Sequence, residues 1–436
     1  MVKYCFDTNK TRGTPAMMIP RIFRFTNYDT IDFKEYLSKN KVEIHLKRKM
    51  NNKFHCGYCR NEIKPDKGFY KVQVQHLPLF NNHTYLIFKK YKGFCSQCKR
   101  TRSEHINFIS KETPHKTKDY SWWVGRLCEI SPVSRVAEVL KESGSSTWRL
   151  DYSRMKRMLS KYKIPKAKRI CVDEVYTRRK KEKGETRDDL FFTIICDLDT
   201  RRVIWVSYSR RKEALDEFFL IIGAKACERI KVVATDMHEG YGASVRQYCP
   251  GATQVWDRFH IMQQFDDAVN ETRKQLHDEA RKGSEEHRLT RGKFRFMFLK
   301  KSNRRSPVER EHIESVFNEN KQFLRLELVK ERMHSFFNAR TEKEAYEIFD
   351  EIGGWVWQSD LVPLMRWHEF MAKKWKILKN YFTFRVTSGL AEGMNHVIKT
   401  LKRKGYGYRN MHYFKLKILQ TCGYLNSRYI TDPYML

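Results

Sequence analysis

The stretch KRICVDEVYT at residues 168–177 begins a series of apolar segments that continues with LFFTIICDLDT (190–200), RVIWVSYS (202–209) and IKVVATD (230–236). Each segment is rich in β-branched or aromatic residues, which predicts a strand, and its nearly continuous apolar character predicts burial on both faces. Residues 213–227 show helical spacing between the third and fourth segments. This order predicts an α/β fold whose central sheet lies between helices.

A further strand and a long helical region follow these segments. TQVWD at 253–257 is strand-like, residues 262–385 are charged and helical in character, and AEGMNHVIKTLK from residue 391 is typical of a helix returning to the sheet. We therefore expect a core in two parts, 166–261 and 386–436, with residues 262–385 as a helical insertion domain. The end of this insertion is rich in tryptophan, with Trp355, Trp357, Trp367 and Trp375.

Three acids lie where a two-metal phosphoryl-transfer site needs them. Asp173 lies within the first strand, Asp236 ends the fourth strand, and Glu392 opens the returning helix. In an RNase H-like sheet the first and fourth strands are neighbours, so Asp173 and Asp236 should meet and the helix can add Glu392. Carboxylate oxygens are the ligands that magnesium prefers, and two such ions can activate a nucleophile and stabilise the leaving oxygen.

Other acids compete for these roles, because the chain holds 51 of them. A carboxylate inside an apolar strand is unusual unless it is paired or binds metal, which favours Asp173 and Asp236 over a surface carboxylate or a helix cap. Glu174 and Glu239 are the nearest competitors. Strand alternation places Glu174 on the opposite face from Asp173.

Two CxxC pairs predict a zinc site. The thiols of Cys56, Cys59, Cys95 and Cys98 complete a tetrahedral shell with no open position, which indicates structural zinc. The 35 residues between the pairs are strand-like, so we expect a zinc ribbon over residues 40–105. The alternatives are incidental buried thiols, or substitute ligands among His55, His76 and His83.

The remaining N-terminal sequence is less specific. Residues 1–39 contain no motif and are assigned to an N-terminal arm. Residues 106–165 contain two amphipathic segments separated by a turn around Gly144, which predicts a helix-turn-helix and a linker. The alternative is a pair of structural helices in a linker domain.

The charge of the chain points to a polyanionic partner. Its 436 residues include 86 Lys plus Arg and 51 Asp plus Glu, giving a net charge of +35 and a pI near 9.7. Nucleic acid is the favoured partner, against a ribosome-associated protein or a lysine-rich surface without a ligand. No apolar run has the length of a membrane helix and no signal peptide is present, so we expect no membrane partner and a reducing intracellular compartment.

Four motifs carry a resemblance to a known family. They are VDE (172–174), TDMHEGYG (235–242), WDRFH (256–260) and above all AEGMNHVIKTLKRKGYGYRN (391–410). With these motifs the chain resembles the ISL-three family of bacterial insertion-sequence transposases over nearly its whole length. The order of zinc ribbon, helix-turn-helix and DDE transposase domain is the same.

The resemblance implies roles for the residues in these motifs. It implies that Asp173, Asp236 and Glu392 are the DDE triad, holding two Mg²⁺ ions for which Mn²⁺ can substitute. Asp257 and His260 are implied to support the site or position DNA, although Asp257 could instead be only a helix cap. Asn395 belongs to the same signature as Glu392 and is placed with the supporting residues.

A basic segment directly after Glu392 predicts contacts with the phosphates of the DNA being cut; a solvated basic face is the alternative. Its candidate residues are Lys399, Lys402, Arg403, Lys404, Tyr408 and Arg409. Other basic runs, at residues 178–183 and near Lys300, predict only nonspecific phosphate contacts.

The resemblance implies a DNA transposase that binds the terminal inverted repeats of its element, cleaves strands there and joins them to target DNA. Because two ends must be brought together, we expect a homodimer or larger assembly on double-stranded DNA. The expected location is the bacterial cytoplasm, with the nucleoid when DNA is bound. The rivals are a nuclease of the same fold without strand transfer, and a DNA-binding regulator whose catalytic core has decayed.

Overall fold

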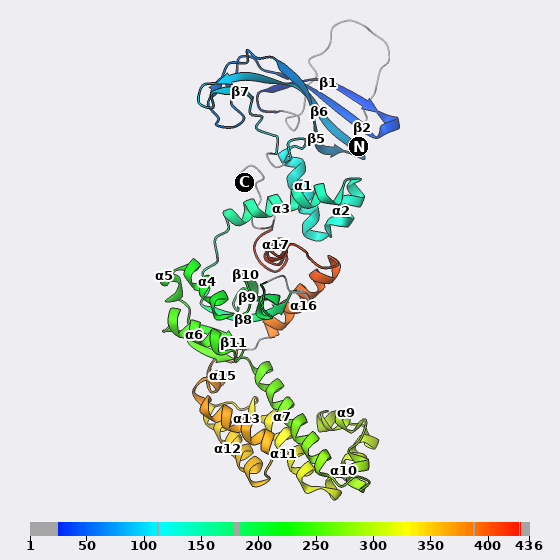
Figure 1. Ribbon diagram of the computed structural model, residues 1–436, viewed down its shortest axis with the longest axis vertical. Helices are drawn as coiled ribbons and strands as arrows, with labels where there is room; N and C mark the ends of the chain where they lie inside the picture. The colour runs from blue at the N-terminus through cyan, green and yellow to red at the C-terminus, as the bar shows by residue number, and fades with distance from the viewer. Residues whose placement is uncertain (1–24, 111–112, 178–183, 387–388, 427, 429–436) are drawn as a thin grey trace. The chain divides into compact units, whose positions relative to one another are not determined.

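The computed structural model describes residues 25–110, 113–177, 184–386, 389–426 and 428. The chain divides into two compact units, which Figure 1 traces through their helices and strands. The first comprises residues 1–161 with 426–436, and the second comprises residues 162–425.

The first unit contains a sheet in the order β1-β2-β6-β5, to which β7 adds by pairing with β6. Alternating residues such as Ile44, Leu86 and Phe88 are buried in its core. A small β3-β4 hairpin forms a second sheet. The strands are β1 (Tyr28–Tyr36), β2 (Lys41–Arg48), β3 (Phe54–His55), β4 (Glu62–Ile63), β5 (Phe69–Leu79), β6 (Asn82–Cys95) and β7 (Arg100–Ser103), with the short helix η2 (Leu37–Lys39) after β1.

Strand β1 lies in the segment that the sequence pattern assigned to the N-terminal arm. It pairs with β2 in antiparallel register from Tyr28↔Arg48 to Tyr36↔Lys41. Its sequence, YDTIDFKEY, is mostly exposed and charged, which suits an edge strand but hides the hydrophobic alternation that identifies one. The described part of the arm therefore includes a strand of the first unit.

Three helices complete the first unit: α1 (Lys118–Ile130), α2 (Val133–Leu140) and α3 (Gly144–Ser160). Helix α2 ends at Lys141, whose φ of 53° is left-handed. Helix α3 begins after Ser143, whose hydroxyl accepts a hydrogen bond from the Ser146 amide at 3.2 Å. Apolar residues of all three helices form one core, namely Tyr120, Val124, Cys128, Val136, Leu140 and Leu150.

A buried arginine fixes the packing of α1 on α3. The Arg154 guanidinium is fully buried, pairs with Glu129 at 2.5 Å and lies 4.2 Å from the ring of Trp122. Gly125 makes room for it, because a Cβ at that position would lie 2.2 Å from Cδ of Arg154. A side chain at residue 125 would displace the arginine from its ion pair.

The second unit is built on a five-stranded sheet in the order β10-β9-β8-β11-β12. Strand β9 runs antiparallel to β8 and β10, whereas β11 runs parallel to β8 and β12. The first and fourth strands are neighbours, as the sequence predicts, and this order is consistent with an RNase H-like core. The strands are β8 (Arg169–Tyr176), β9 (Phe191–Asp197), β10 (Arg202–Tyr208), β11 (Val232–Thr235) and β12 (Thr253–Trp256), with η3 (Asp188–Leu190) before β9.

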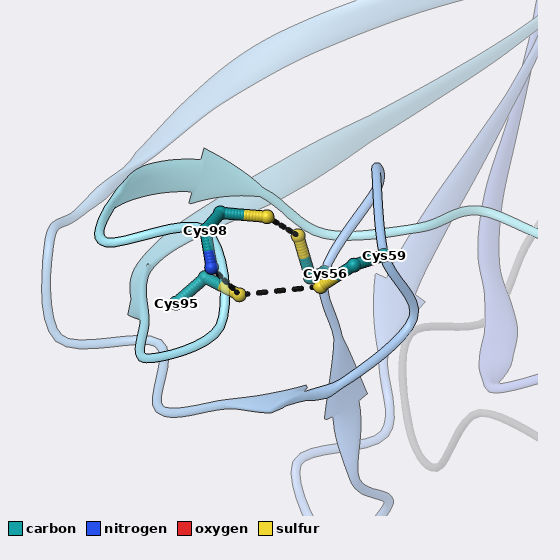
Figure 2. Close-up of side chains that lie close together, drawn as sticks. All are labelled: Cys56, Cys59, Cys95 and Cys98. Atoms are coloured by element: carbon teal, nitrogen blue, oxygen red, sulfur yellow. Dashed lines mark hydrogen bonds between the residues drawn. The ribbon is translucent and has the colours of Figure 1, made fainter.

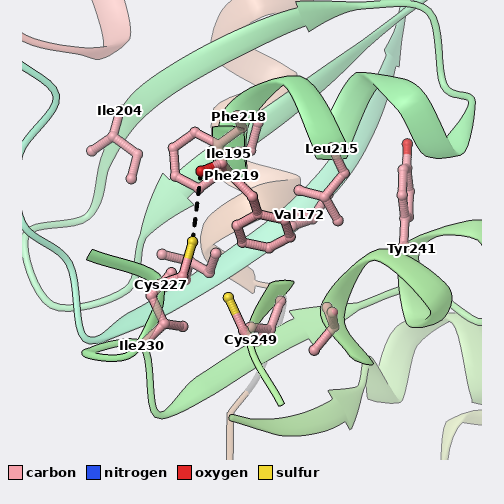
Figure 3. Packing of buried hydrophobic residues seen from close by; sticks show 13 residues of the cluster. Val172, Ile195, Ile204, Leu215, Phe218, Phe219, Cys227, Ile230, Tyr241 and Cys249 are labelled. Atoms are coloured by element: carbon pink, nitrogen blue, oxygen red, sulfur yellow. Dashed lines mark hydrogen bonds between the residues drawn. The ribbon is translucent and has the colours of Figure 1, made fainter. Parts of the chain in front are cut away.

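Helices cover both faces of this sheet. On one face, α4 (Lys212–Ile222), α5 (Ala224–Cys227) and α6 (Glu239–Tyr248) bury the cluster shown in Figure 3, which includes Val172, Ile195, Phe218 and Tyr241. On the other face lie α16 (Gly389–Lys404) and α17 (Met411–Cys422). There Asn395 of α16 contacts Asp173 of β8, and Phe414 of α17 contacts Phe192 of β9. The sheet therefore presents Val172 to one layer and Asp173 to the other.

A helical region lies between β12 and α16. It begins with α7 (Arg258–Glu279) and returns to the sheet through α15, where the Asn380 amide donates a hydrogen bond to the Gln254 carbonyl at 2.8 Å. The other helices are α8 (Glu285–Leu289), α9 (Phe294–Phe298), η4 (Ser302–Arg304), α10 (Pro307–Glu319), α11 (Lys321–Phe336), α12 (Glu342–Gln358), α13 (Val362–Lys373), α14 (Trp375–Leu378) and α15 (Asn380–Phe384).

This helical region contains its own buried core and a buried charge network. Phe298, Phe323 and Phe336 are fully buried. Glu327 accepts hydrogen bonds from Arg305 at 2.8 Å and from Lys330 at 2.8 Å. Both cations also donate to the carbonyl of Phe298, so the network ties the segment after α9 to α11.

None of the helices in the described part of the chain combines the length and apolar character needed to cross a membrane.

Candidate active site and metal centre

Strand register brings acids from three adjacent strands to one edge of the sheet. The parallel pairing of β11 with β8 ends at Ala234↔Cys171, and its continuation by two residues places Asp236 beside Asp173. Strand β11 also pairs with β12 through Thr235↔Trp256, so Asp257 follows at the same edge. The Asp257 amide donates to the Thr235 carbonyl at 3.0 Å, which fixes this end of β12.

Helix α16 supplies a partner for Asp173. The Asn395 Nδ2 amide donates to Oδ2 of Asp173 at 2.7 Å and to the backbone carbonyl of Glu174 at 3.3 Å. The other carboxylate oxygen, Oδ1, accepts from the Glu174 amide at 2.8 Å. Both oxygens of Asp173 are therefore oriented, one by its own strand and one by a residue 222 positions away.

Helix α7 contributes His260 and Asp257. Nε2 of His260 lies 4.0 Å from Oδ1 of Asp173 and 3.8 Å from Oδ2 of Asp257. Asp257 is also the N-cap of α7, because its Oδ1 accepts a hydrogen bond from the Phe259 amide at 3.0 Å. The helix-cap interpretation is therefore correct, and the same buried carboxylate also faces His260 near Asp173.

Burial raises the pKa of Asp173 to about 6. The Glu174 amide and the neighbouring His260 lower the pKa, whereas the negative charges of Asp236 and Asp257 raise it. Carboxylates collected in this way repel one another, and a bound cation relieves that repulsion. The electrostatics of this edge therefore favour a cation.

Glu392 is exposed in the first turn of α16, three residues before Asn395. Residues three apart lie on the same face of a helix, so Glu392 lies on the face that carries Asn395 toward Asp173. Within the described residues, Asp173, Asp236 and Glu392 are not among the groups whose ligand atoms lie within 4.8 Å of one another. Glu392 therefore shares a helix face with Asn395, but the carboxylates of Asp173, Asp236 and Glu392 do not all lie within 4.8 Å of one another.

The competing acids have other partners. The Glu174 carboxylate pairs with Arg210 at 3.0 Å, on the sheet face opposite Asp173, as strand alternation predicts. Glu239 pairs with Arg246 at 2.9 Å and Lys374 at 3.6 Å.

Arg210 is a residue near the site that the sequence analysis missed. Its guanidinium bridges Glu174 and Asp188 at 3.0 and 2.8 Å, which ties η3 to the end of β8 beside Asp173. Arg210 lies in a basic run, SRRK, that gives no local signal of a partner 36 residues away. The basic run at 178–183, expected to contact phosphates, lies outside the described residues.

The acidic edge fits the oxygen-ligated divalent cation that this type of site needs. Three carboxylates approach it from β8, β11 and β12, and the buried Oδ1 of Asn395 has no hydrogen-bond partner in the described part of the chain. Carboxylate and amide oxygens are hard donors that suit Mg²⁺ and Mn²⁺. The donor set is thus compatible with a divalent metal.

The basic segment after Glu392 is mixed in character. Lys399, Arg403 and Lys404 are exposed on α16, and Arg409 is exposed beyond it. The Lys402 ammonium donates to the carbonyl of Tyr176 at 3.5 Å. Tyr408 is half-buried and its ring stacks on Phe414, with centroids 4.6 Å apart. Lys399, Arg403, Lys404 and Arg409 are therefore available to solvent, whereas Lys402 contacts the end of β8 and the ring of Tyr408 packs on Phe414.

The four predicted zinc ligands converge in the first unit (Figure 2). The two knuckles bring the Sγ atoms together within 4.8 Å, with Cys56 and Cys98 at 3.9 Å and Cys59 and Cys95 at 3.4 Å. A tetrahedral zinc with bonds of about 2.3 Å requires sulfur separations of roughly 3.8 Å. The cluster therefore fits one zinc ion.

The local backbone also prepares a thiolate. Burial alone would raise the pKa of the Cys56 thiol, but hydrogen bonds from the amides of Cys59 and Tyr58 lower the pKa to about 6. The thiolate is the form that binds metal. The histidines considered as substitutes have other surroundings: His55 bonds to the Arg60 carbonyl and His76 to Thr117.

The α/β core with its acidic edge, together with the cysteine cluster, defines the class: a DDE-type DNA transposase with a zinc ribbon. A transposase family model of the DDE type matches residues 170–418, more than half of the chain, and a model described as the zinc-finger of transposases IS204, IS1001, IS1096 and IS1165 matches residues 52–98. The chain belongs to the ISL3, or ISL-three, family of insertion-sequence transposases.

Curated relatives agree with this assignment. The chain is 22% identical over 354 residues to the transposase of insertion sequence IS1001 from Bordetella parapertussis, covering 79% of this chain and 83% of that protein. It is also 22% identical over 265 residues to the transposase of IS1557 from Mycobacterium tuberculosis, covering 56% of this chain and 57% of that protein. As a family member it binds DNA, and its DDE domain requires a divalent metal.

Proposed function

We propose that Asp173, Asp236 and Glu392 are the DDE triad and hold two Mg²⁺ ions, with Mn²⁺ as a substitute. The placement of Asp236 beside Asp173, with Asn395 of the Glu392 helix bonded to Asp173, is the observation that carries this proposal. When bound, two such metal ions activate water or a 3′-hydroxyl and stabilise the leaving oxygen.

The surrounding side chains orient the triad. Asn395 holds the Asp173 carboxylate in one rotamer, and Asp257 holds the start of α7 so that His260 faces the same carboxylate. Because these residues act through the triad, we treat them as positioning residues.

The exposed cations of α16, together with Arg409 beyond its end, would contact the phosphates of the strand being cut. Lys399, Arg403 and Lys404 are exposed in the last two turns of α16, and Arg409 is exposed five residues beyond its end. Lys402 is nearer to the sheet, at the Tyr176 carbonyl, and would act at the end of β8. Such contacts position DNA without reading its sequence.

The zinc ribbon and helices α2 and α3 would recognise the terminal inverted repeats. The turn between α2 and α3 spans residues 141–143, and α3 exposes Arg149 and Lys156. A short turn followed by a helix with exposed polar side chains suits a helix-turn-helix whose second helix enters the major groove. The helical region 262–385 would be an insertion domain of the RNase H-like core.

The full reaction is strand cleavage at the element ends followed by joining to target DNA. Both steps are displacements at phosphorus that can use the same carboxylates. Two ends must be held together, so the active form is a homodimer or larger assembly. Both named relatives come from bacteria, which supports a bacterial cytoplasm and, with DNA bound, the nucleoid.

A strand-transfer assay tests this function. Labelled double-stranded DNA carrying an element end is incubated with the protein, Mg²⁺ and an unlabelled plasmid. We expect label to become covalently joined to the plasmid, and the joining to be lost in Asp236→Asn while DNA binding is retained. Cleavage without joined product would instead identify a nuclease of the same fold.

A further inference from the structure

Three lysines form one row across adjacent strands of the first-unit sheet. The parallel pairing of β2 with β6 reaches Leu46↔Phe88, so Lys47 and Lys89 occupy the next position side by side, and β5 pairs Lys71 with Lys89. Neighbouring strands lie about 4.8 Å apart, so the row spans roughly 10 Å at the backbone. Leu46 and Phe88 are buried, and alternation therefore places Lys47 and Lys89 on the opposite face.

All three lysines of this row are exposed. Within the described residues, none of their ammonium groups has a carboxylate within ion-pair distance or a hydrogen-bond acceptor. The Lys89 ammonium lies 4.2 Å from the centre of the Phe69 ring, which is itself 51% exposed. The row is thus a cationic surface with an exposed aromatic ring beside it.

Three other lysines at the same sheet are neutralised by acids. Like charges directly opposite each other on a sheet are destabilising, and the neighbouring pairs avoid that cost. Asp29, which is opposite Lys47 in register, is engaged by another lysine. The neutralised pairs are Lys41 with Glu43 at 2.6 Å, Lys49 with Asp29 at 3.0 Å and Lys34 with Asp32 at 3.8 Å.

We infer that the row of Lys47, Lys89 and Lys71 binds the sugar-phosphate backbone of duplex DNA. A polyanion offsets the repulsion within the row, and lysine ammonium groups bind phosphates as point charges without selecting bases. The row therefore adds affinity that does not depend on sequence, separate from any base reading by α3. This inference rests on the proposed binding of DNA by the N-terminal modules and does not depend on the triad.

The salt dependence of DNA binding tests the row. We compare the triple variant Lys47→Gln/Lys71→Gln/Lys89→Gln with wild type by fluorescence anisotropy on a random-sequence duplex of about 30 base pairs. Each phosphate contact contributes roughly 0.9 to the magnitude of the slope of log K against log salt. We expect the magnitude of this negative slope to decrease by about 2 to 3 in the triple variant. The affinity should fall about tenfold or more.

The matched control removes the same charge elsewhere in the unit. Lys39, Lys64 and Lys99 are exposed and lie outside the row, and their triple change to Gln should leave the slope close to wild type. The triple Lys→Arg variant of the row should also keep the slope, which separates charge from shape. Zinc content and circular dichroism show whether each variant keeps its fold.

An unchanged slope in the Gln variant of the row, or an equal loss in the control, overturns the inference. If the Gln variant loses zinc, Lys71→Gln alone replaces it, with an expected slope decrease of about 0.9. In parallel, DNA cleavage by Asp173→Ala is measured, which tests the triad separately from the lysine row. If Asp173→Ala still cuts while the row controls the slope, the triad proposal fails and the row stands.

Discussion

Half-buried Asp173 lies among acids whose charges cost stability when no cation is bound. Its neighbours are Asp236, Asp257 and His260, and burial raises its pKa to about 6. In the unfolded chain a carboxyl of this type titrates near 3.8, so ionisation favours unfolding between these two values. The contribution of Asp173 to the free energy of unfolding is therefore most favourable below pH 3.8. It decreases as the pH rises from 3.8 to about 6, and it is constant above that value.

Asp173→Asn should therefore stabilise the metal-free protein at pH 7 and have little effect at pH 4. A shift from 3.8 to about 6 corresponds to at most about 3 kcal/mol in the free energy of unfolding. Urea unfolding at both pH values measures the difference between variant and wild type. The exposed Asp350→Asn is the control, and an Asp173→Asn effect of the same size at both pH values would contradict the explanation.

At this scale the sequence predicted that Asp173 and Asp236 lie side by side, but it did not reveal which residues bond to the acids. Asp173 and Asp236 could be selected because acids are rare in apolar strands, and alternation correctly separated Glu174 from Asp173. The hydrogen bond from Asn395 could be anticipated only through a family motif, because 222 residues separate donor and acceptor. No local pattern revealed that Arg210 bridges two segments.

Among the elements, the zinc ribbon has a small apolar core and depends on its metal ion for stability. Its buried cluster consists of Phe54, Ile63 and the cysteines, packed with Tyr91. Such a core buries too little apolar surface to hold the hairpin without the ion.

Cys56→Ser should lose the bound zinc and the β3-β4 hairpin. Metal content, measured by a colorimetric zinc-release assay, is expected to fall from one ion per chain to less than about half, with weaker DNA binding. Cys422→Ser, which changes a buried thiol of the second unit, should retain its zinc. Full zinc occupancy in Cys56→Ser would show that the four thiols are not the ligand set.

The buried network of α11 is a second element whose stability can be measured. Glu327 neutralises Arg305 and Lys330, all three being less than a tenth exposed. Burial lowers the pKa of Lys330, so its ammonium depends on this carboxylate.

Glu327→Gln should cost about 3 kcal/mol or more in the free energy of unfolding, because it leaves two buried cations without their counterion. Chemical denaturation, monitored by tryptophan fluorescence, measures the decrease in the free energy of unfolding. The more exposed Glu331, 3.9 Å from Lys330, offers the control Glu331→Gln, for which we expect less than about 1 kcal/mol. Equal losses in the two variants would refute the assigned importance of the network.

Elements were predictable where hydrophobic periodicity is strong. The strands and helices of the second unit follow the apolar segments from Ile170 to Trp256, and the two CxxC pairs located the ribbon. Strand β1 was not predicted, because the charged residues of this edge strand hide the hydrophobic alternation that identifies a strand. The break between α4 and α5 also escaped prediction, since it arises at Gly223, whose φ of 75° ends the first helix.

For the whole molecule, the net charge of +35 is distributed over both units, and a single DNA-binding surface does not account for it. The N-terminal modules and the cations after Glu392 would engage different parts of the same DNA. The chain thus has the charge to bind an end at several points.

Transposition of an element requires both ends in one complex, so cleavage should depend on an assembly of at least two chains. Mass photometry of the protein with element-end duplex in Ca²⁺ should show a species with two chains and two DNA ends. Its abundance should follow the cleavage rate as the protein concentration is varied. Efficient cleavage and joining by a complex of one chain with one end would refute this prediction.

The central claim, that Asp173, Asp236 and Glu392 form the catalytic triad, is tested most directly by cleavage of end-labelled element DNA in Mg²⁺. Wild type is compared with Asp173→Ala, Asp236→Ala and Glu392→Ala, and binding is measured in parallel. We expect each variant to bind the ends and to cleave at least about a hundredfold more slowly. Wild-type cleavage by Glu392→Ala would contradict the claim and move the third ligand to another acid near Asp173.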